Sequence, residues 1–133
     1  MKLTPSSLAV CAFAVATMPA WAQSAGPTDP QIAAIVVTAN QVDIDAGKLA
    51  ATKSQSKPVK DFAQLMVTDH SSVNQSAVDL VTKLKVTPQD NATAQSLKKC
   101  GEDNLANLRK LSGPAFELAS VEHEVAYNEA VIG

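Results

Sequence analysis

Four polar side chains fall on helix faces that are otherwise apolar, and they are the residues of this sequence best placed to do chemistry. At about 100° per residue, His70 lies on the apolar stripe of one predicted helix and Asp43 on the stripe of another. Glu124 and Asn128, four residues apart, share an edge of an apolar face near the end of the sequence. Because a buried carboxylate needs a partner, we expect Asp43 to contact His70 and all four side chains to converge inside a helical bundle.

Two kinds of chemistry fit this set. One is a metal site in which Asp43, His70 and Glu124 supply carboxylate and imidazole ligands to iron, manganese or zinc. The other is a buried ion pair or hydrogen-bond network that holds no cofactor. Di-iron bundles carry Glu-x-x-His on two helices, and this motif does not occur here, since Val67 and Ser120 stand three residues before the two histidines. We therefore favour the structural network and keep the metal site as the alternative.

Other functional signatures are missing from the sequence. His123-Glu124 begins like the H-E-x-x-H motif of zinc proteases, but Tyr127 stands where the second histidine is needed. There is no Gly-rich phosphate loop and no G-x-S-x-G motif. With a net charge of -2 over 133 residues, the chain also lacks the basic patch of a nucleic-acid-binding protein. The sequence thus favours a protein that is not an enzyme and has no nucleic-acid partner, and it offers no catalytic residue.

The N-terminal residues 1–22 have the pattern of a secretory signal peptide. Lys2 supplies the positive start, and Leu8 to Met18 form an apolar run that is too short to span a bilayer. Ala20-Trp21-Ala22 gives the small-x-small pattern of a cleavage site. We therefore predict cleavage after Ala22 and export to the periplasm or the cell envelope.

The elements that must position the polar residues are helices. Residues 23–29 are polar and are expected to be a disordered leader, after which apolar residues recur at helical spacing. Asp29 can cap the first helix ahead of Pro30. Gly47 weakens that helix by about 1 kcal/mol relative to Ala and lets a neighbouring helix come close. We predict one all-α bundle domain over residues 30–133, with helices at about 30–52, 58–85, 88–111 and 115–132.

The last predicted helix is apolar on two opposite sides. Such a helix requires neighbours on both sides, so either a partner subunit covers the second face or the bundle lacks a further, last helix. The first alternative predicts a homo-oligomer. One side carries Phe116, Ala119, Tyr127 and Ala130, and the other carries Leu118, Val121, Val125 and Ile132.

Several blocks of the sequence resemble a known family. They are an acidic residue before G-K-L-A (Asp43 to Ala50), V-K-D-F-A-Q-L-M (Val59 to Met66), D-H-S beginning at Asp69, L-R-K-L-S-G-P-A-F (Leu108 to Phe116) and E-V-A-Y (Glu124 to Tyr127). In this order, over about residues 30–132, they resemble the bacterial exported family called domain of unknown function 4142.

The resemblance implies a ferritin-like helical bundle in the periplasm or envelope, often associated with the outer membrane, with no enzymatic activity securely attached. Three departures from the family pattern reduce the case for a metal. Asn128 stands where the family usually has His, Asp43 stands where it tends to have Glu, and the family continues into one more long helix.

From these observations we expect an exported, ferritin-like helical bundle with a non-enzymatic, structural or stress-associated role in the envelope. The alternative is a metal-binding bundle that uses Asp43, His70 and Glu124.

Overall fold

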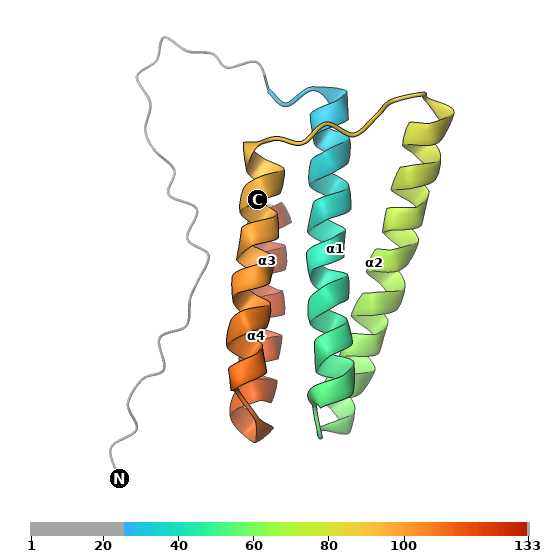
Figure 1. Cartoon of the computed structure of the whole chain (residues 1–133). Coiled ribbons are helices and arrows are strands. Elements are labelled where there is room, and N and C mark those ends of the chain that lie inside the picture. The colour runs from blue at the N-terminus through green and yellow to red at the C-terminus, as the bar shows by residue number, and fades with distance from the viewer. Residues whose placement is uncertain (1–25, 133) are drawn as a thin grey trace.

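The computed structural model describes residues 26–132 and shows four α-helices joined by short connections (Figure 1). Residues 1–25, which hold the predicted signal peptide and the first three residues of the predicted leader, lie outside the described residues, as does Gly133. Residues 26–132 contain no strand, so the predicted all-α bundle is confirmed. The helices are α1 (Asp29–Lys53), α2 (Lys57–Lys83), α3 (Ala92–Lys110) and α4 (Gly113–Ile132).

α1 begins one residue earlier than the sequence predicts, and the cap is Thr28 rather than Asp29. The backbone N–H of Thr28 donates to Oε1 of Gln31 at 2.9 Å. Pro30 lies in the first turn, where its missing N–H costs nothing. The predicted position of Pro30 is therefore right, although the cap is displaced by one residue.

α3 begins at Ala92, later than the predicted start at residue 88, because Asn91 forms its N-cap. The Asn91 side-chain oxygen accepts a hydrogen bond from the Ala94 N–H at 3.1 Å, as an N-cap does. The residues before it are tied to the start of α1: the Gln89 N–H donates to the Pro30 carbonyl at 2.8 Å, and the Asn91 amide donates to the Gln31 carbonyl at 3.1 Å. The connection from α2 to α3 therefore crosses the beginning of α1.

α1 is the central helix of the bundle. It lies between α2 on one side and α3 on the other, and α4 packs against α3 and α1 (Figure 1). Consecutive helices run in opposite directions, so α2 and α4 run the same way. We call the end with the α1–α2 and α3–α4 connections the closed end. The other end, with residues 26–36 and 77–91, is the open end.

The apolar interior consists of two groups of buried residues, both centred on α1. Large aromatic side chains are few, and small Ala residues let the helices approach. The group toward the open end contains Ala39, Val42, Leu97 and Tyr127. The group at the closed end contains Ala50, Ala63, Leu108 and Phe116.

Gly47 marks a close approach of α1 and α2, as the sequence predicts. A Cβ atom at this position would lie 2.9 Å from Cγ2 of Val67 and 3.0 Å from the carbonyl oxygen of Ala63. Gly101 plays the same part between α3 and α1, where a Cβ atom would lie 2.7 Å from Cγ2 of Val42. The close helix spacing that these glycines permit brings the polar residues of α1 within reach of their partners.

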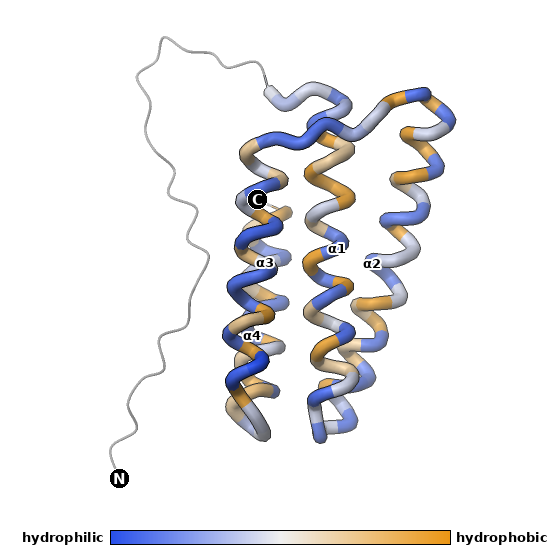
Figure 2. Tube along the Cα trace, in the orientation of Figure 1, coloured by the Kyte–Doolittle hydropathy of each residue, from blue (hydrophilic) through white to orange (hydrophobic). Residues whose placement is uncertain are grey.

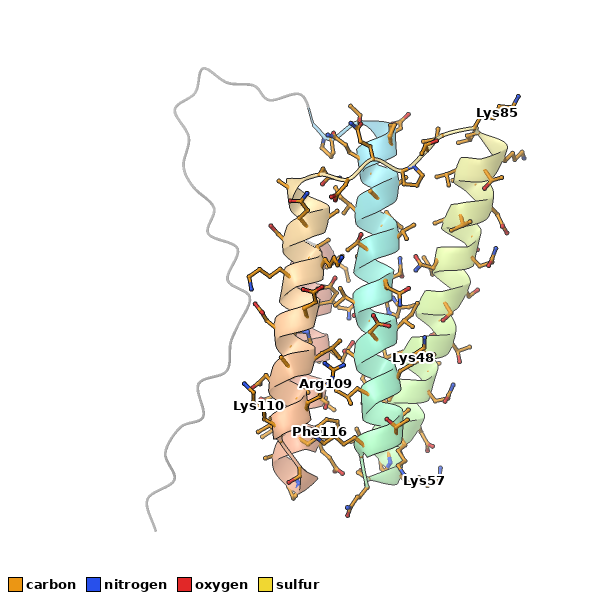
Figure 3. All side chains as sticks on the ribbon, in the orientation of Figure 1. Lys48, Lys57, Lys85, Arg109, Lys110 and Phe116 are labelled. Atoms are coloured by element: carbon orange, nitrogen blue, oxygen red, sulfur yellow. The ribbon has the colours of Figure 1, made fainter. Side chains whose placement is uncertain are left out.

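Two charged side chains, Lys53 and Glu117, connect the helices at the closed end. Nζ of Lys53, the last residue of α1, donates to the carbonyls of Leu108 (3.1 Å) and Arg109 (2.7 Å) at the end of α3, and lies 5.1 Å from the Phe116 ring centroid. Figure 3 shows Phe116 at this end of the bundle, with Lys57 nearby and Lys85 at the far end. A cation at a helix C-terminus is stabilising because it meets the carbonyls that have no partner within the helix.

Glu117 of α4 binds the connection from α1 to α2. Its Oε1 accepts hydrogen bonds from the Ser54 hydroxyl at 3.0 Å and from the backbone N–H groups of Gln55 at 3.0 Å and Ser56 at 2.9 Å. Burial acts to raise the pKa of Glu117, but these three donors outweigh it and hold the pKa below its usual value. The carboxylate of α4 thus accepts hydrogen bonds from the backbone N–H groups that immediately precede α2.

α2 diverges from the rest of the bundle toward the open end. Hydrophobic residues recur along the whole of α2, including the part that lies away from α1 (Figure 2). Val73, Leu80 and Leu84 continue the apolar stripe of α2 at helical spacing, but their exposed fractions are 49%, 55% and 61%. No helix of the described chain covers that part of the stripe.

Candidate functional site

The predicted contact between Asp43 and His70 is present, and it joins α1 to α2. Nδ1 of His70 lies 3.2 Å from Oδ2 of Asp43 and 2.8 Å from Oδ1 of Asn40. The Asp43 side chain is 4% exposed and that of His70 is 21% exposed. Because both acceptors face the same ring nitrogen, a proton on Nδ1 satisfies the two α1 side chains together.

α4 brings Glu124 and Asn128 to the other side of Asp43, so the four predicted side chains do converge. The Asn128 amide lies 3.5 Å from Oδ1 of Asp43 and also donates to the Glu124 carbonyl at 3.0 Å. A hydrogen bond between the two carboxyl groups links Glu124 to Asp43. We call Asn40, Asp43, His70, Glu124 and Asn128 the polar cluster.

The two carboxyl groups cannot both ionise without cost in this position. Burial, followed by the charge of Asp43 and the hydrogen bond to it, raises the pKa of Glu124 to about 8. Burial also raises the pKa of Asp43, against the opposing effect of His70. We infer that the pair holds one proton near neutral pH.

Two further aromatic groups border the polar cluster from α4. The Tyr127 hydroxyl lies 3.4 Å from the carbonyl oxygen of Ala39, and its ring stacks on His123 with centroids 5.8 Å apart. Burial raises the pKa of Tyr127 and lowers the pKa of His123, so both side chains are held in their neutral forms at neutral pH. They act as packing groups with polar atoms rather than as charges.

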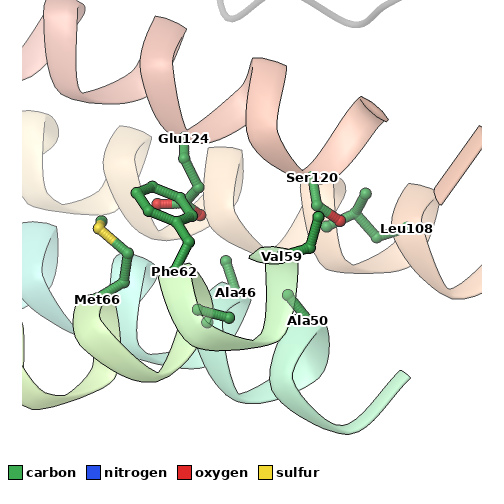
Figure 4. A pocket seen from close by; sticks show the side chains of 10 residues that line it. Ala46, Ala50, Val59, Phe62, Met66, Leu108, Ser120 and Glu124 are labelled. Carbon is green, nitrogen blue, oxygen red and sulfur yellow. The ribbon is translucent and has the colours of Figure 1, made fainter. Parts of the chain in front are cut away.

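A small pocket adjoins Glu124 on the side toward α2. Figure 4 shows Glu124 beside Phe62 and Met66, with Ser120 of α4 farther along the same wall. The lining is almost wholly apolar. Oε2 of Glu124 is buried and has no hydrogen-bond partner. A protonated carboxyl with one unpartnered oxygen is less costly in such surroundings than an ionised one.

The donor set of the polar cluster does not form a ready metal site. Among residues 26–132, no three His, Cys, Asp or Glu side chains are grouped as metal ligands would be. Nδ1 of His70 is directed at Asp43 and Asn40, and Asn128 is a weak ligand. Metal binding by Asp43, His70 and Glu124 stays a prediction, and it requires these side chains to rearrange.

Asn40, which bonds to His70, is not among the residues that the sequence predicts for this site. Its signal is its position one turn before Asp43, on the side of α1 that faces α2. Asn40 also donates to the Val36 carbonyl at 2.8 Å, which leaves its oxygen free to meet the imidazole. An asparagine among apolar helix residues could have been treated in the same way as Asp43.

A model of one protein family matches residues 14–133, nearly the whole sequence. The family is described as a domain of unknown function, DUF4142. The chain belongs to this family. The match confirms the resemblance that the G-K-L-A, D-H-S and E-V-A-Y blocks indicate. No curated protein and no solved structure matches this DUF4142 chain significantly.

The surface of the DUF4142 domain carries large apolar side chains. No helix within residues 26–132 combines the length and the hydropathy that a membrane crossing requires. Eleven large apolar side chains in this part of the chain are at least 36% exposed, and ten of them lie on α4 or on α2 and its C-cap. The exposed apolar surface is therefore concentrated on two of the four helices.

Proposed function

We propose that this DUF4142 chain is an exported periplasmic or envelope protein whose bundle acts by packing against other helices, in a non-enzymatic, structural or stress-associated role. The observation that carries the proposal is the concentration of exposed apolar side chains on α2 and α4. Monomeric soluble proteins rarely expose large contiguous apolar patches unless these serve as interaction sites.

The polar cluster supports a structural role for the interior. Asp43 is bonded to groups from α2 and α4, and the imidazole of His70 bridges two α1 side chains. Such a network fixes how three helices sit relative to one another. It presents no activated nucleophile, and His123 beside it is held neutral by burial.

Export rests on the N-terminal pattern of Lys2, the apolar run and Ala20-Trp21-Ala22. The test is to express the full chain in a bacterial host, fractionate the cells and measure the intact mass of the protein. Export predicts a periplasmic or envelope-bound product that begins at Gln23. An unprocessed chain in the cytoplasm would contradict it.

The role in the envelope is tested by complementation of a strain that lacks the gene, grown with detergent or EDTA. Wild type should restore growth, whereas Val125→Glu on the exposed side of α4 should not. The matched control is Val78→Glu, which changes a similarly exposed valine on another surface and should restore growth. Rescue by both variants would count against action through the α4 surface.

Metal binding is the second candidate, and one observation favours it. Oε2 of Glu124 is buried without a partner, beside the carboxylate of Asp43 and near His70. In a ferritin-like arrangement, Asp43, His70 and Glu124 would hold iron, manganese or zinc after a local rearrangement.

The metal candidate is tested by the metal content of untagged mature protein purified from the periplasm. Near-stoichiometric metal that disappears in His70→Ala, together with thermal stabilisation by the same ion, would support it. Folded, metal-free protein whose stability does not respond to added Fe, Mn or Zn would leave the polar cluster as part of the fold.

A further inference from the structure

We propose that a second copy of this chain docks on one continuous apolar surface built from α2, α4 and the beginning of α1. The inference rests on the proposed function, because it names the partner through which the bundle packs. The sequence predicts association through α4 alone, but the structure adds a groove between α1 and α2 to the same side of the molecule.

The evidence begins on α1, with a row of residues spaced three and four apart. Ala39, Asp43 and Ala50 of this row meet α4 or its aromatic residues. Ile32 and Val36 continue the row toward the open end, where α4 does not cover them. The side of α1 that faces α4 at the closed end is thus uncovered at the open end.

α2 supplies the second wall of the same opening. Leu80 and Leu84 line a groove of about 300 Å³ together with Ile32 and Val36, and almost all of its surface is apolar. Nearer the closed end, Met66 lies on the same flank of α2 and adjoins Glu124 of α4. The groove is therefore an extension of the space between α2 and α4.

The exposed side of α4 borders this opening. Glu117 and Asn128 lie on α4 between its buried face and its exposed apolar face, and they bond to the α1–α2 connection and to Asp43. Going around the helix past these two residues leads to the side toward α2. We call that face the outer face of α4. It carries the exposed residues Leu118, Val125 and Ile132 and the half-buried Val121.

The size of the surface fits a dimer. Ile32, the exposed residues of α2 on this flank and the exposed residues of α4 are each 36–85% exposed, so together they leave open an apolar area of the same order as the ~800 Å² per partner of a standard interface. The largest patch of a typical monomer is ~300–600 Å². A lone helix from another protein would cover only part of a surface that spans three helices.

A second copy also has the right shape. α2 and α4 run in the same direction and diverge toward the open end. Two such pairs placed face to face bring four helices together, with α2 of each copy lying over the opening of the other. This contact uses the same patch on both copies, as a two-fold dimer requires.

The test is sedimentation equilibrium of the mature protein, residues 23–133, at micromolar concentrations. Wild type should be dimeric, and Leu84→Glu or Val125→Glu should raise the dissociation constant at least about tenfold with helix content unchanged by circular dichroism. The control is Val78→Glu: Val78 is 45% exposed but lies beside Ile44 on the opposite side of the α1–α2 pair. This variant should stay dimeric.

The outcomes separate this inference from the proposed function. A wild-type monomer, or a dimer weakened as much by Val78→Glu as by Val125→Glu, would overturn the second copy as the occupant. If the protein is monomeric while Val125→Glu still fails to complement the deletion strain, packing against a different partner survives and the dimer does not. If the dimer forms as described while every variant complements, the proposed envelope role fails and the dimer stands.

Discussion

The two ends of this bundle are built from the same four helices but differ in what covers their apolar residues. At the closed end, Phe116 and Leu108 are each 1% exposed, and Lys53 and Glu117 cross-link the helix termini. At the open end, Leu80 and Leu84 sit on a correctly patterned helix and remain more than half exposed. The comparison teaches that helical patterning marks which residues can be buried, whereas the number of neighbouring helices decides which of them are.

The largest expected contrast between the ends comes from truncating one apolar side chain in each. Phe116→Ala should lower the free energy of unfolding by about 3–5 kcal/mol, because it opens a cavity among Ala50, Ala63 and Leu108. Leu84→Ala at the open end should cost less than about 0.5 kcal/mol in the monomer. Urea denaturation at high dilution measures both, and equal losses would break the comparison.

The polar cluster, which lies between the ends, should make stability depend on pH. Folded Glu124 has a pKa of about 8, against 4.5 for an ordinary glutamate, so it keeps a proton that the unfolded chain releases. Its contribution to stability is therefore present at low pH and lost as pH rises through about 8.

Glu124→Gln keeps the shape of the group without the titration, so it should remove this dependence. Relative to the variant, wild type should lose a few kcal/mol between pH 5 and pH 9, since each pKa unit corresponds to about 1.4 kcal/mol. The measurement is urea denaturation of both proteins across that range. Parallel pH profiles would show that Glu124 ionises in the folded protein as an ordinary carboxyl.

A smaller effect should follow from adding one methyl group where α1 meets α2. A Cβ atom on Gly47 would press on the Ala63 carbonyl oxygen and on Val67, and the backbone oxygen cannot move aside. Overpacking costs about 1–3 kcal/mol, and better helix propensity returns about 1 kcal/mol, so Gly47→Ala should be destabilising by about 1 kcal/mol. Gly26→Ala, with nothing within 4 Å, is the control and should be neutral.

The smallest effect concerns the cross-link at the closed end. Lys53→Met keeps most of the stem but removes the donor to the Leu108 and Arg109 carbonyls, so it should cost about 1 kcal/mol. Lys57→Met, which removes a surface ion pair with Asp61 that is 83% and 63% exposed, should cost less than about 0.5 kcal/mol. In thermal melts, Lys53→Met should lower the melting temperature more than Lys57→Met does. The reverse order would contradict the stabilising role of Lys53.

The sequence allowed the helices and most of the polar cluster to be predicted, because both depend on spacing along one chain. The predicted ranges 30–52 and 58–85 match the bounds of α1 and α2 within a residue or two. The predicted Asp43–His70 contact followed from two polar residues on apolar stripes that needed each other. Helix boundaries and pairs of buried polar residues depend on local or pairwise interactions, which the spacing of residues in the sequence can predict.

The parts that could not be predicted depend on how many helices meet at a given point. The buried face of α4 includes Ser120 and leaves Ala130 exposed, although the sequence places Ala130 on the apolar side with Phe116, because packing against the other helices sets the rotation of α4. The exposure of Val73 likewise reflects the divergence of α2 from its neighbours. The late start of α3 arises because Asn91 caps it while bonding to α1. The periodicity of a single segment does not predict helix rotation, exposure or caps that depend on contacts with other helices.

The most direct test of the account is hydrogen exchange of the mature protein at two concentrations, above and below the dissociation constant of the dimer. The account predicts that amides of α2 at the open end, residues 77–84, and of the outer face of α4 gain protection with concentration. Amides of α1 around Gly47 should be protected equally at both concentrations, because the closed end is complete within one chain. Hydrogen-exchange protection of residues 77–84 that is high at both concentrations would contradict the claim that a second copy covers this end of the bundle.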